Sequence, residues 1–251
     1  MLRQVGNIVL LGTSHVSKQS TEEIKQLITH LNPEVIGIEL DMGRLKSLLS
    51  PVKKQPSMFE LVRRVGFSGF LFAKIGGYVQ KKVGKSLNID PGEDMKTAYL
   101  TARDYKVPTI LIDQEISITL RRLSKISFFK KVTMLGNLVI KSFKKEYRKK
   151  LNFDIKHLPD DEQLNVILSI YEKEVPDLYR VLIHERNIYM ANKLLQMREK
   201  HPEGIILAVI GAGHVFGMEK YLREKLFAEQ KINSIKFKIT VDTEHVNVEN
   251  N

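Results

Sequence analysis

Four short, mainly apolar runs stand out from a chain in which apolar and polar residues are otherwise mixed. They cover residues 7–11, 35–39, 107–113 and 205–210. Between the runs, apolar residues recur every three or four positions, which is the period of a helix with one buried face. Continuous apolar runs separated by helical stretches are typical of parallel strands buried on both faces. The pattern predicts an α/β fold with a central, largely parallel sheet flanked by helices.

Capping and turn-forming residues indicate where the predicted helices begin and end. Ser20 and Glu23 have the spacing of a capping box, so a helix is expected from there to Asn32. Asp41 is the expected N-cap of a second helix. A third helix is expected to open at residues 91–94 and to return the chain to the sheet.

The last part of the chain predicts one helix and one strand. Residues 218–227 have the helical period, whereas apolar and polar residues alternate over 232–241. We expect the alternating segment to be a strand at the edge of the sheet, which would make the sheet mixed at that edge.

The order of these elements predicts a single α/β domain over residues 1–251. Its core is expected to come from residues 1–50, 91–115 and 203–245. Residues 51–90 and 116–200 are expected to be helical insertions. The two ends of the chain must then meet in one core.

The first and last apolar runs are each followed by the pattern Gly-x-x-His, at Gly12–His15 and Gly211–His214. The other two runs end in acids, Glu39 and Asp113. In a parallel sheet the carboxyl ends of the strands share one edge, and ligands bind beyond that edge. The sequence therefore predicts two histidines and two carboxylates close together.

Histidine and carboxylate side chains together suit a divalent transition metal ion. A site with two histidines, one carboxylate and open positions can activate a bound water molecule. The alternative is a metal-free polar network, because a histidine after a strand can simply form a hydrogen bond with a loop carbonyl. Asp113 is expected to orient a histidine from outside the metal ligands.

Composition places the chain among ordinary globular proteins. Of its 251 residues, 43% are hydrophobic and 27% are charged. It contains no cysteine, which excludes disulfides, thiolate metal sites and cysteine nucleophiles. No signal peptide is recognisable, and no apolar stretch approaches the roughly 18 residues that predict a transmembrane helix. We expect a cytoplasmic location.

Almost all of the net charge of +11 lies in residues 121–150, where eleven basic residues accompany one acid. Apolar residues interleave with the basic ones. A basic amphipathic helix of this kind can lie on an anionic membrane surface. The alternative is a helix that packs in the core or in a homodimer interface. Nucleic-acid binding is disfavoured, because no known binding module is present.

Several separated segments resemble the TraB/PrgY pheromone-shutdown family, which is related to the GumN and TIKI proteins and more distantly to the erythromycin-esterase and ChaN-like fold. The matching segments are 12–17, 33–41 with Arg44, 91–95, Asp113 with Thr119, 185–187 with Met190, and 211–215. The resemblance covers most of the chain. Two positions depart from it: Gln114, where relatives often have arginine, and Asn187, where the family has aspartate.

The resemblance implies a metallohydrolase centre, with peptidase activity claimed for some relatives. The implied metal ligands are His15, Glu39 and His214, and the ion is expected to be Mn, Co or Zn. Glu185 is a candidate general base, and Arg186 is a candidate clamp for a substrate carboxylate or phosphate. The alternative for both is a structural ion pair with Arg44 or Glu39.

Two functions stay open at this point. The first is a metal-dependent, peptidase-like hydrolase in which Glu185 handles protons and Arg186 or Arg44 positions a peptide or small-molecule substrate. The second is a non-enzymatic protein of the pheromone-shutdown type that sequesters a peptide or other ligand at a membrane. Many family members carry a membrane-spanning tail, and no such segment is expected within these 251 residues.

Overall fold

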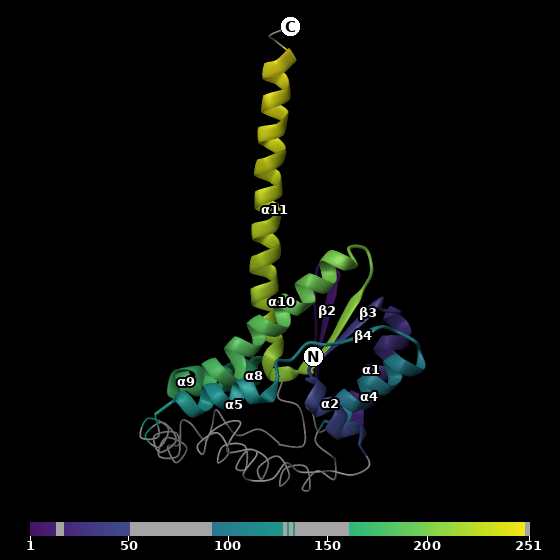
Figure 1. Ribbon diagram of the computed structural model, residues 1–251, viewed down its shortest axis with the longest axis vertical. Coiled ribbons are helices and arrows are strands. Elements are labelled where there is room, and N and C mark those ends of the chain that lie inside the picture. Colours follow the sequence, from purple (N-terminus) through teal and green to yellow (C-terminus); the bar gives the residue numbers. More distant parts are fainter. Residues whose placement is uncertain (14–17, 51–91, 128–129, 131–132, 134–160, 249–251) are drawn as a thin grey trace.

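The computed structural model describes residues 1–13, 18–50, 92–127, 130, 133 and 161–248 (Figure 1). In this part of the chain, five strands form one sheet in the order β1-β2-β5-β3-β4. They are Leu2–Val5 (β1), Ile8–Thr13 (β2), Val35–Ile38 (β3), Thr109–Leu111 (β4) and Ile206–Gly211 (β5). β2, β5, β3 and β4 are parallel, and β1 is antiparallel to β2. The predicted α/β fold, with a largely parallel sheet that is mixed at the edge, is confirmed.

Helices cover both faces of the sheet (Figure 1). One face packs against Lys18–Leu31 (α1), Met42–Leu49 (α2) and Glu93–Asp104 (α4), and the other against Glu185–Lys200 (α10) and Ala212–Val248 (α11). The other helices of the described residues are Ile116–Lys125 (α5), Asp161–Glu174 (α8), Pro176–Tyr179 (α9) and the π-helical turn Arg180–His184 (η1). The helices expected after Asp41 and from residues 91–94 are present. The helix expected to end at Asn32 is also present, but it begins at Lys18, so Ser20 lies inside its first turn and is not its N-cap.

Alternate residues of the same strands fill the two sides of the core. In β2, Ile8 and Leu10 belong to the cluster with α10 and α11, whereas Val9 and Leu11 belong to the cluster with α1, α2 and α4. Every residue of the central strand β5 is buried. Because helices cover both faces, most positions of these strands are apolar, which explains their apolar runs.

β2 and β5 come from opposite ends of the chain and pair directly. Gly12 lies opposite Ile210, and Thr13 lies opposite Gly211. A Cβ atom on Gly12 would lie 2.5 Å from Val215 Cγ2, so glycine lets the first turn of α11 pack against β2. The two Gly-x-x-His segments therefore begin side by side, and the expected meeting of the two chain ends is confirmed.

The predicted edge strand over 232–241 is wrong, because α11 continues through this segment to Val248. Neither Gly nor Pro, the two residues that most strongly interrupt a helix, occurs from Met218 to Val248. The antiparallel edge of the sheet is β1 instead. In Figure 1 the C-terminal half of α11 extends away from the sheet. None of the helices described, α11 included, is both long and apolar enough to cross a bilayer.

Some predictions concern segments that the structure does not describe. The helical insertion at 51–90 lies outside the described residues, as do residues 128–129, 131–132 and 134–150 of the basic segment. The amphipathic helix, membrane contact and dimer interface expected of that segment stay predictions.

Candidate active site at the carboxyl edge of the sheet

Glu39 follows β3 and is the centre of a buried polar group at the carboxyl edge of the sheet. Its side chain is 3% exposed. The N–H of Gly211, at the end of β5, donates to Glu39 Oε2 at 2.6 Å. Arg186 Nη2, from the first turn of α10, donates to Glu39 Oε1 at 2.5 Å. Both carboxylate oxygens are therefore oriented by the protein itself.

His214 approaches the same carboxylate from the first turn of α11. Its Nε2 lies 3.4 Å from Glu39 Oε1, and its side chain is 6% exposed. On the other side of the ring, His214 Nδ1 lies 2.6 Å from Asn187 Oδ1. The amide oxygen assigns the proton of the neutral ring to Nδ1, which leaves the lone pair on Nε2. When the ring is neutral, the lone pair of Nε2 therefore faces Glu39 Oε1.

The packing of α10 against α11 holds Asn187 beside His214. Asn187 is buried. A Cβ atom on Gly217 would lie 2.1 Å from Asn187 Nδ2, so this glycine provides the space that Asn187 occupies. The sequence indicates Asn187 only as a departure from the family pattern and does not predict its contact with His214.

A second buried carboxylate, Asp113, binds the same arginine. Arg186 Nε donates to Asp113 Oδ1 at 3.0 Å, and Arg186 Nη2 donates to Asp113 Oδ2 at 2.8 Å. Arg44 Nη1, from α2, donates to Asp113 Oδ2 at 3.3 Å. The backbone N–H of Gln114 donates to Asp113 Oδ1 at 2.8 Å. Arg186 therefore links Asp113, which follows β4, to Glu39, which follows β3.

The charge of Arg186 is strongly favoured where it lies. Burial by itself lowers the pKa of this guanidinium, but the charges of Glu39 and Asp113 and the hydrogen bonds to them raise its pKa above the ordinary arginine value. A planar guanidinium can serve two carboxylates in this way because its N–H groups point in several fixed directions.

Two more buried carboxylates lie along the same edge. Thr13 Oγ1, at the end of β2, donates to Asp94 Oδ2. Asp41 Oδ1 caps α2, while Asp41 Oδ2 is buried without a hydrogen-bond partner among the described residues. The sequence predicts Asp41 only as a helix cap and Asp94 only as part of a matching segment. With Glu39 and Asp113, four carboxylates of the described residues therefore lie along this edge.

Comparison with known proteins identifies the family of this chain. A model of the TraB/PrgY/gumN family matches residues 3–228, a range that contains every site residue named so far. The chain belongs to the TraB/PrgY/gumN family. The resemblance carried by its separated motifs is therefore confirmed.

Relatives of this TraB-family chain occur in archaea and in mammals. An uncharacterized protein of Methanocaldococcus jannaschii is 35% identical over 227 residues, which cover 87% of this chain and 54% of the relative. The TraB domain-containing proteins of Mus musculus and Homo sapiens are 25% and 24% identical over 245 residues, covering 85% of this chain and 62% of each relative. The chain thus spans between half and two thirds of the length of these relatives.

Of the three metal ligands that the TraB resemblance implies, the structure brings Glu39 and His214 together. His15 lies outside the described residues, two positions after the end of β2. In the described part of the chain, no group of three His, Asp or Glu side chains is arranged to hold a metal ion. The metal site stays a prediction.

The three residues expected to act on substrate have different surroundings. Arg44 and Arg186 both contact Asp113, and Arg186 also forms the ion pair with Glu39 that the sequence leaves open as an alternative to a substrate clamp. Glu185 Oε2 accepts instead from Arg122 Nη1 at 2.5 Å. Glu185 lines a separate surface pocket, and its role as a general base stays a prediction.

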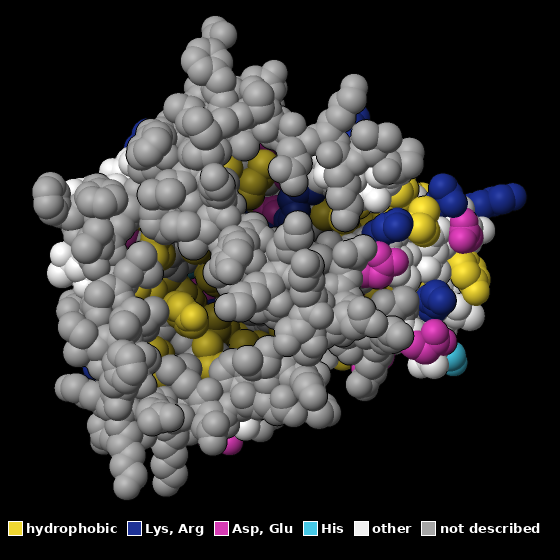
Figure 2. All heavy atoms as spheres, turned by 90° about the horizontal axis from the view of Figure 1, so that it is seen from below, with side chains coloured by type: hydrophobic (Ala, Val, Ile, Leu, Met, Phe, Trp, Pro, Cys, Tyr) yellow, Lys and Arg dark blue, Asp and Glu magenta, His cyan; other side chains and the backbone are white. Residues whose placement is uncertain are grey.

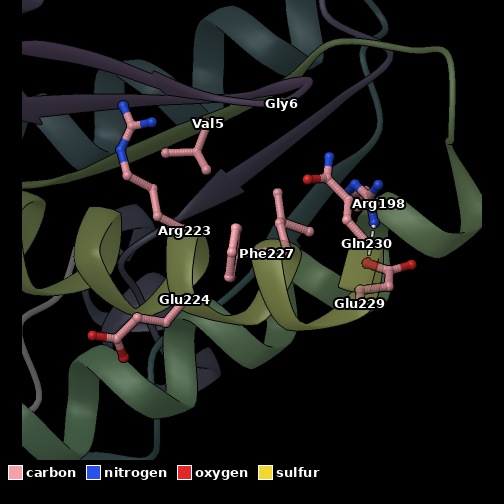
Figure 3. Close-up of a pocket in the computed structure, with 9 residues that line it drawn as sticks. Val5, Gly6, Arg198, Arg223, Glu224, Phe227, Glu229 and Gln230 are labelled. Atoms are coloured by element: carbon pink, nitrogen blue, oxygen red, sulfur yellow. Dashed lines mark hydrogen bonds and ion pairs between the residues drawn. The ribbon is translucent and has the colours of Figure 1, made fainter. Parts of the chain in front are cut away.

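Figure 2 shows the molecule from below the view of Figure 1, and hydrophobic, acidic and basic side chains of the described residues are visible there between residues drawn in grey. The cavity in Figure 3, about 630 Å³, lies between the β1–β2 turn at Val5 and Gly6, Arg198 of α10, and Phe227 of α11. Because Gly6 precedes β2, this cavity is at the opposite, amino-terminal edge of the parallel strands and contains none of the candidate site residues.

Proposed function

We propose that this chain is a metal-dependent hydrolase of peptide or amide bonds, in which Glu39 and His214 are two of the metal ligands and His15 is the third. The observation that carries the proposal is the separation of 3.4 Å between Glu39 Oε1 and His214 Nε2, both buried. Two lone-pair atoms at this distance repel each other unless they share a cation or a proton. A divalent cation is the partner that these ligand types prefer.

The surrounding side chains fit such an ion. Metal-binding histidines usually donate their other ring N–H to an oxygen that fixes the ring, as His214 does to Asn187. The chain has no cysteine, so its ligand atoms are nitrogen and oxygen, which suits Mn, Co or Zn. Asp41 Oδ2, buried without a hydrogen-bond partner in the described part of the chain, adds to the local negative charge. His15 is included among the ligands only because it ends the first copy of the repeated Gly-x-x-His motif.

A bound divalent ion would lower the pKa of a water molecule and polarise a substrate carbonyl. The protein's own residues supply orientation and charge balance. Gly211 N–H and Arg186 fix the Glu39 carboxylate from two directions. Asp113 holds Arg186 with two hydrogen bonds, so the guanidinium cannot turn away from Glu39 without breaking them.

Arg44 is better placed than Arg186 to bind an anionic group of the substrate. The Arg44 side chain is 33% exposed, whereas that of Arg186 is 15% exposed. Arg44 makes a single contact of 3.3 Å with Asp113, so guanidinium donors remain for a substrate in the described part of the chain. A carboxylate is the group that such a guanidinium binds bidentately.

Metal content tests the proposal most directly. The wild type, His214→Ala and Glu39→Gln are each incubated with Mn, Co or Zn, desalted and analysed by elemental mass spectrometry. The matched controls are His201→Ala and Glu34→Gln, which remove the members of another, more exposed histidine–glutamate pair. We expect the site variants to lose the metal and the controls to keep it. Equal metal content in the wild type and His214→Ala would remove His214 from the site.

Activity is tested on the same proteins. Each metal-loaded protein is incubated with a mixed peptide library, and newly formed amino groups are measured. We expect cleavage by the wild type and both controls, and background rates for the two site variants. Glu185→Gln is tested in parallel. An unchanged rate there would exclude Glu185 as the general base.

A metal-free binding protein is the second candidate, and the ion pair between Arg186 and Glu39 favours it. In this case the guanidinium alone neutralises Glu39, and the cleft sequesters a peptide or other ligand without cutting it. This function would be established if the wild type binds a peptide tightly, retains no metal and cleaves no peptide with any of the three ions.

A further inference from the structure

A separate cationic pocket lies on the surface beside the start of α10. Its volume of about 430 Å³ is within the range of roughly 300–1,000 Å³ typical of small-ligand sites. Ile126 and Val181 line it and belong to a small apolar cluster in which α5 packs against α9 and η1. Its charged lining residues are Arg122, Lys125, Lys130, Asp177, Arg180 and Glu185.

Among the described residues that line it, the pocket has four cations and two carboxylates. Each carboxylate has one close cation: Arg122 Nη1 lies 2.5 Å from Glu185 Oε2, and Lys130 Nζ lies 2.5 Å from Asp177 Oδ2. Arg180 lies further from both, at 3.8 Å from Glu185 Oε1 and 3.5 Å from Asp177 Oδ1. The cations therefore outnumber the anions that hold them in place, and the positive charge left over favours an anionic ligand.

The π-helical turn η1 produces this arrangement. The N–H of Glu185 donates to the carbonyl oxygen of Arg180, five residues earlier. In a regular α-helix, side chains five residues apart point about 140° away from each other. The wider π turn brings Arg180 and Glu185 to the same side, while Arg186 points into the buried site. π turns are frequent at functional sites.

We propose that this pocket binds a phosphate group, carried by a soluble organophosphate or by a lipid headgroup. Guanidinium groups such as those of Arg122 and Arg180 match phosphate oxygens bidentately. Lys125 is exposed and has no ion-pair partner in the described part of the chain, so its ammonium group can add a further contact. The pocket has room for more than the phosphate itself. The proposal does not depend on the proposed hydrolase activity.

Inorganic phosphate is the first probe. It is titrated into the full-length wild type, into Lys125→Gln/Arg180→Gln, and into Lys25→Gln/Arg103→Gln, which changes the net charge equally on the exposed surface of α1 and α4. Binding is followed by calorimetry, and thermal unfolding checks that each variant is folded. We expect affinity to fall about tenfold for each pocket cation removed, and to change less than about twofold in the control.

Vesicles distinguish the two sources of the phosphate group. The same three proteins are sedimented with phosphatidylcholine vesicles that contain or lack phosphatidylglycerol. If the wild type and the control bind vesicles that contain phosphatidylglycerol and the pocket variant does not, the phosphate group belongs to a lipid headgroup. If the pocket cations are needed to bind inorganic phosphate but no protein binds the vesicles, the phosphate group belongs to a soluble organophosphate. The proposal is overturned if the wild type binds neither probe, or if the control variant loses as much affinity as the pocket variant.

Discussion

The parallel strands β3 and β5 have a histidine–glutamate pair at each of their two ends, and the two pairs differ in their surroundings. Before the strands, His201 Nδ1 lies 2.6 Å from Glu34 Oε1. After the strands, His214 Nε2 lies 3.4 Å from Glu39 Oε1. The side chains of the first pair are 26% and 52% exposed, whereas those of the second are 6% and 3% exposed.

Contact distance alone would rank the exposed pair as the stronger interaction. Water solvates Glu34 and His201, however, so their contact contributes little to stability. Glu39 and His214 are buried, and burial is costly unless hydrogen bonds or opposite charges compensate for it. Arg186, the Gly211 N–H and Asn187 provide that compensation. This difference is the reason why we propose the buried pair, and not the exposed pair, as metal ligands.

The largest effect is expected on the free energy of unfolding, because the buried pair after β3 and β5 depends on Arg186 and the exposed pair before these strands does not. Arg186→Met tests it. The substitution leaves Glu39 and Asp113 buried without the guanidinium that joins them. We expect the free energy of unfolding, measured by urea denaturation, to fall by about 3–5 kcal/mol. Arg186→Lys should lose a smaller amount, because an ammonium group keeps the charge but cannot reach both carboxylates in the same way.

Arg198→Met is the matched control for this stability measurement. Arg198 is on the same helix and forms an ion pair of 3.0 Å with Glu229, in which the side chains are 32% and 50% exposed. An exposed pair contributes at most about 1 kcal/mol. Equal losses in the Arg186 and Arg198 variants would show that the buried network contributes no more than a surface ion pair.

The second prediction concerns the contact between His214 and Asn187. Asn187→Asp introduces a carboxylate next to His214 Nδ1, which should make the ring a stronger metal ligand. We expect the affinity for the divalent ion to rise about tenfold, measured by competition with a fluorescent chelator. Asn192→Asp, on the same helix and bound to Tyr221, is the control. An unchanged affinity in Asn187→Asp would mean that this contact does not orient a metal ligand.

Much of the fold can be predicted from the sequence because helices on both faces make most strand positions apolar. The apolar runs therefore mark β2, β3, β4 and β5, and Asp41 caps α2 as expected. The alternation of apolar and polar residues over 232–241 wrongly predicts a strand, because α11 continues without interruption through this segment. β1 is missed because its residues are partly exposed and so lack a continuous apolar run.

The candidate site could be predicted only in part. Glu39 and His214 follow strands, so the topology of a parallel sheet places both at one edge. The contact between Asn187 and His214 depends on how α10 packs against α11, and no local pattern reports that packing. Glu185 and Arg186 are neighbours in sequence, yet the π turn before them sends one to the surface pocket and the other to the buried site.

The third prediction uses two glycines of the same helix. Gly217→Ala would place a Cβ atom 2.1 Å from Asn187 Nδ2, whereas at Gly213 the nearest atom to a Cβ is at 4.0 Å. Asn187 must move to admit Gly217→Ala, which moves it away from His214. We expect Gly217→Ala to lose about 1 kcal/mol of stability and to lose metal affinity, while Gly213→Ala is neutral or slightly stabilising. Retained metal affinity in Gly217→Ala would show that the Asn187 contact is dispensable.

The smallest effect is expected at the exposed pair, and His201→Ala measures it. Removing this imidazole leaves Glu34 in contact with water, so no buried charge loses its partner. We expect urea denaturation to show a change below about 1 kcal/mol, and the change should shrink further at high salt. His214→Ala provides the contrast, because it leaves Glu39 and Asn187 buried and facing an empty space. Similar losses from the two histidine variants would mean that burial does not distinguish the two ends of these strands.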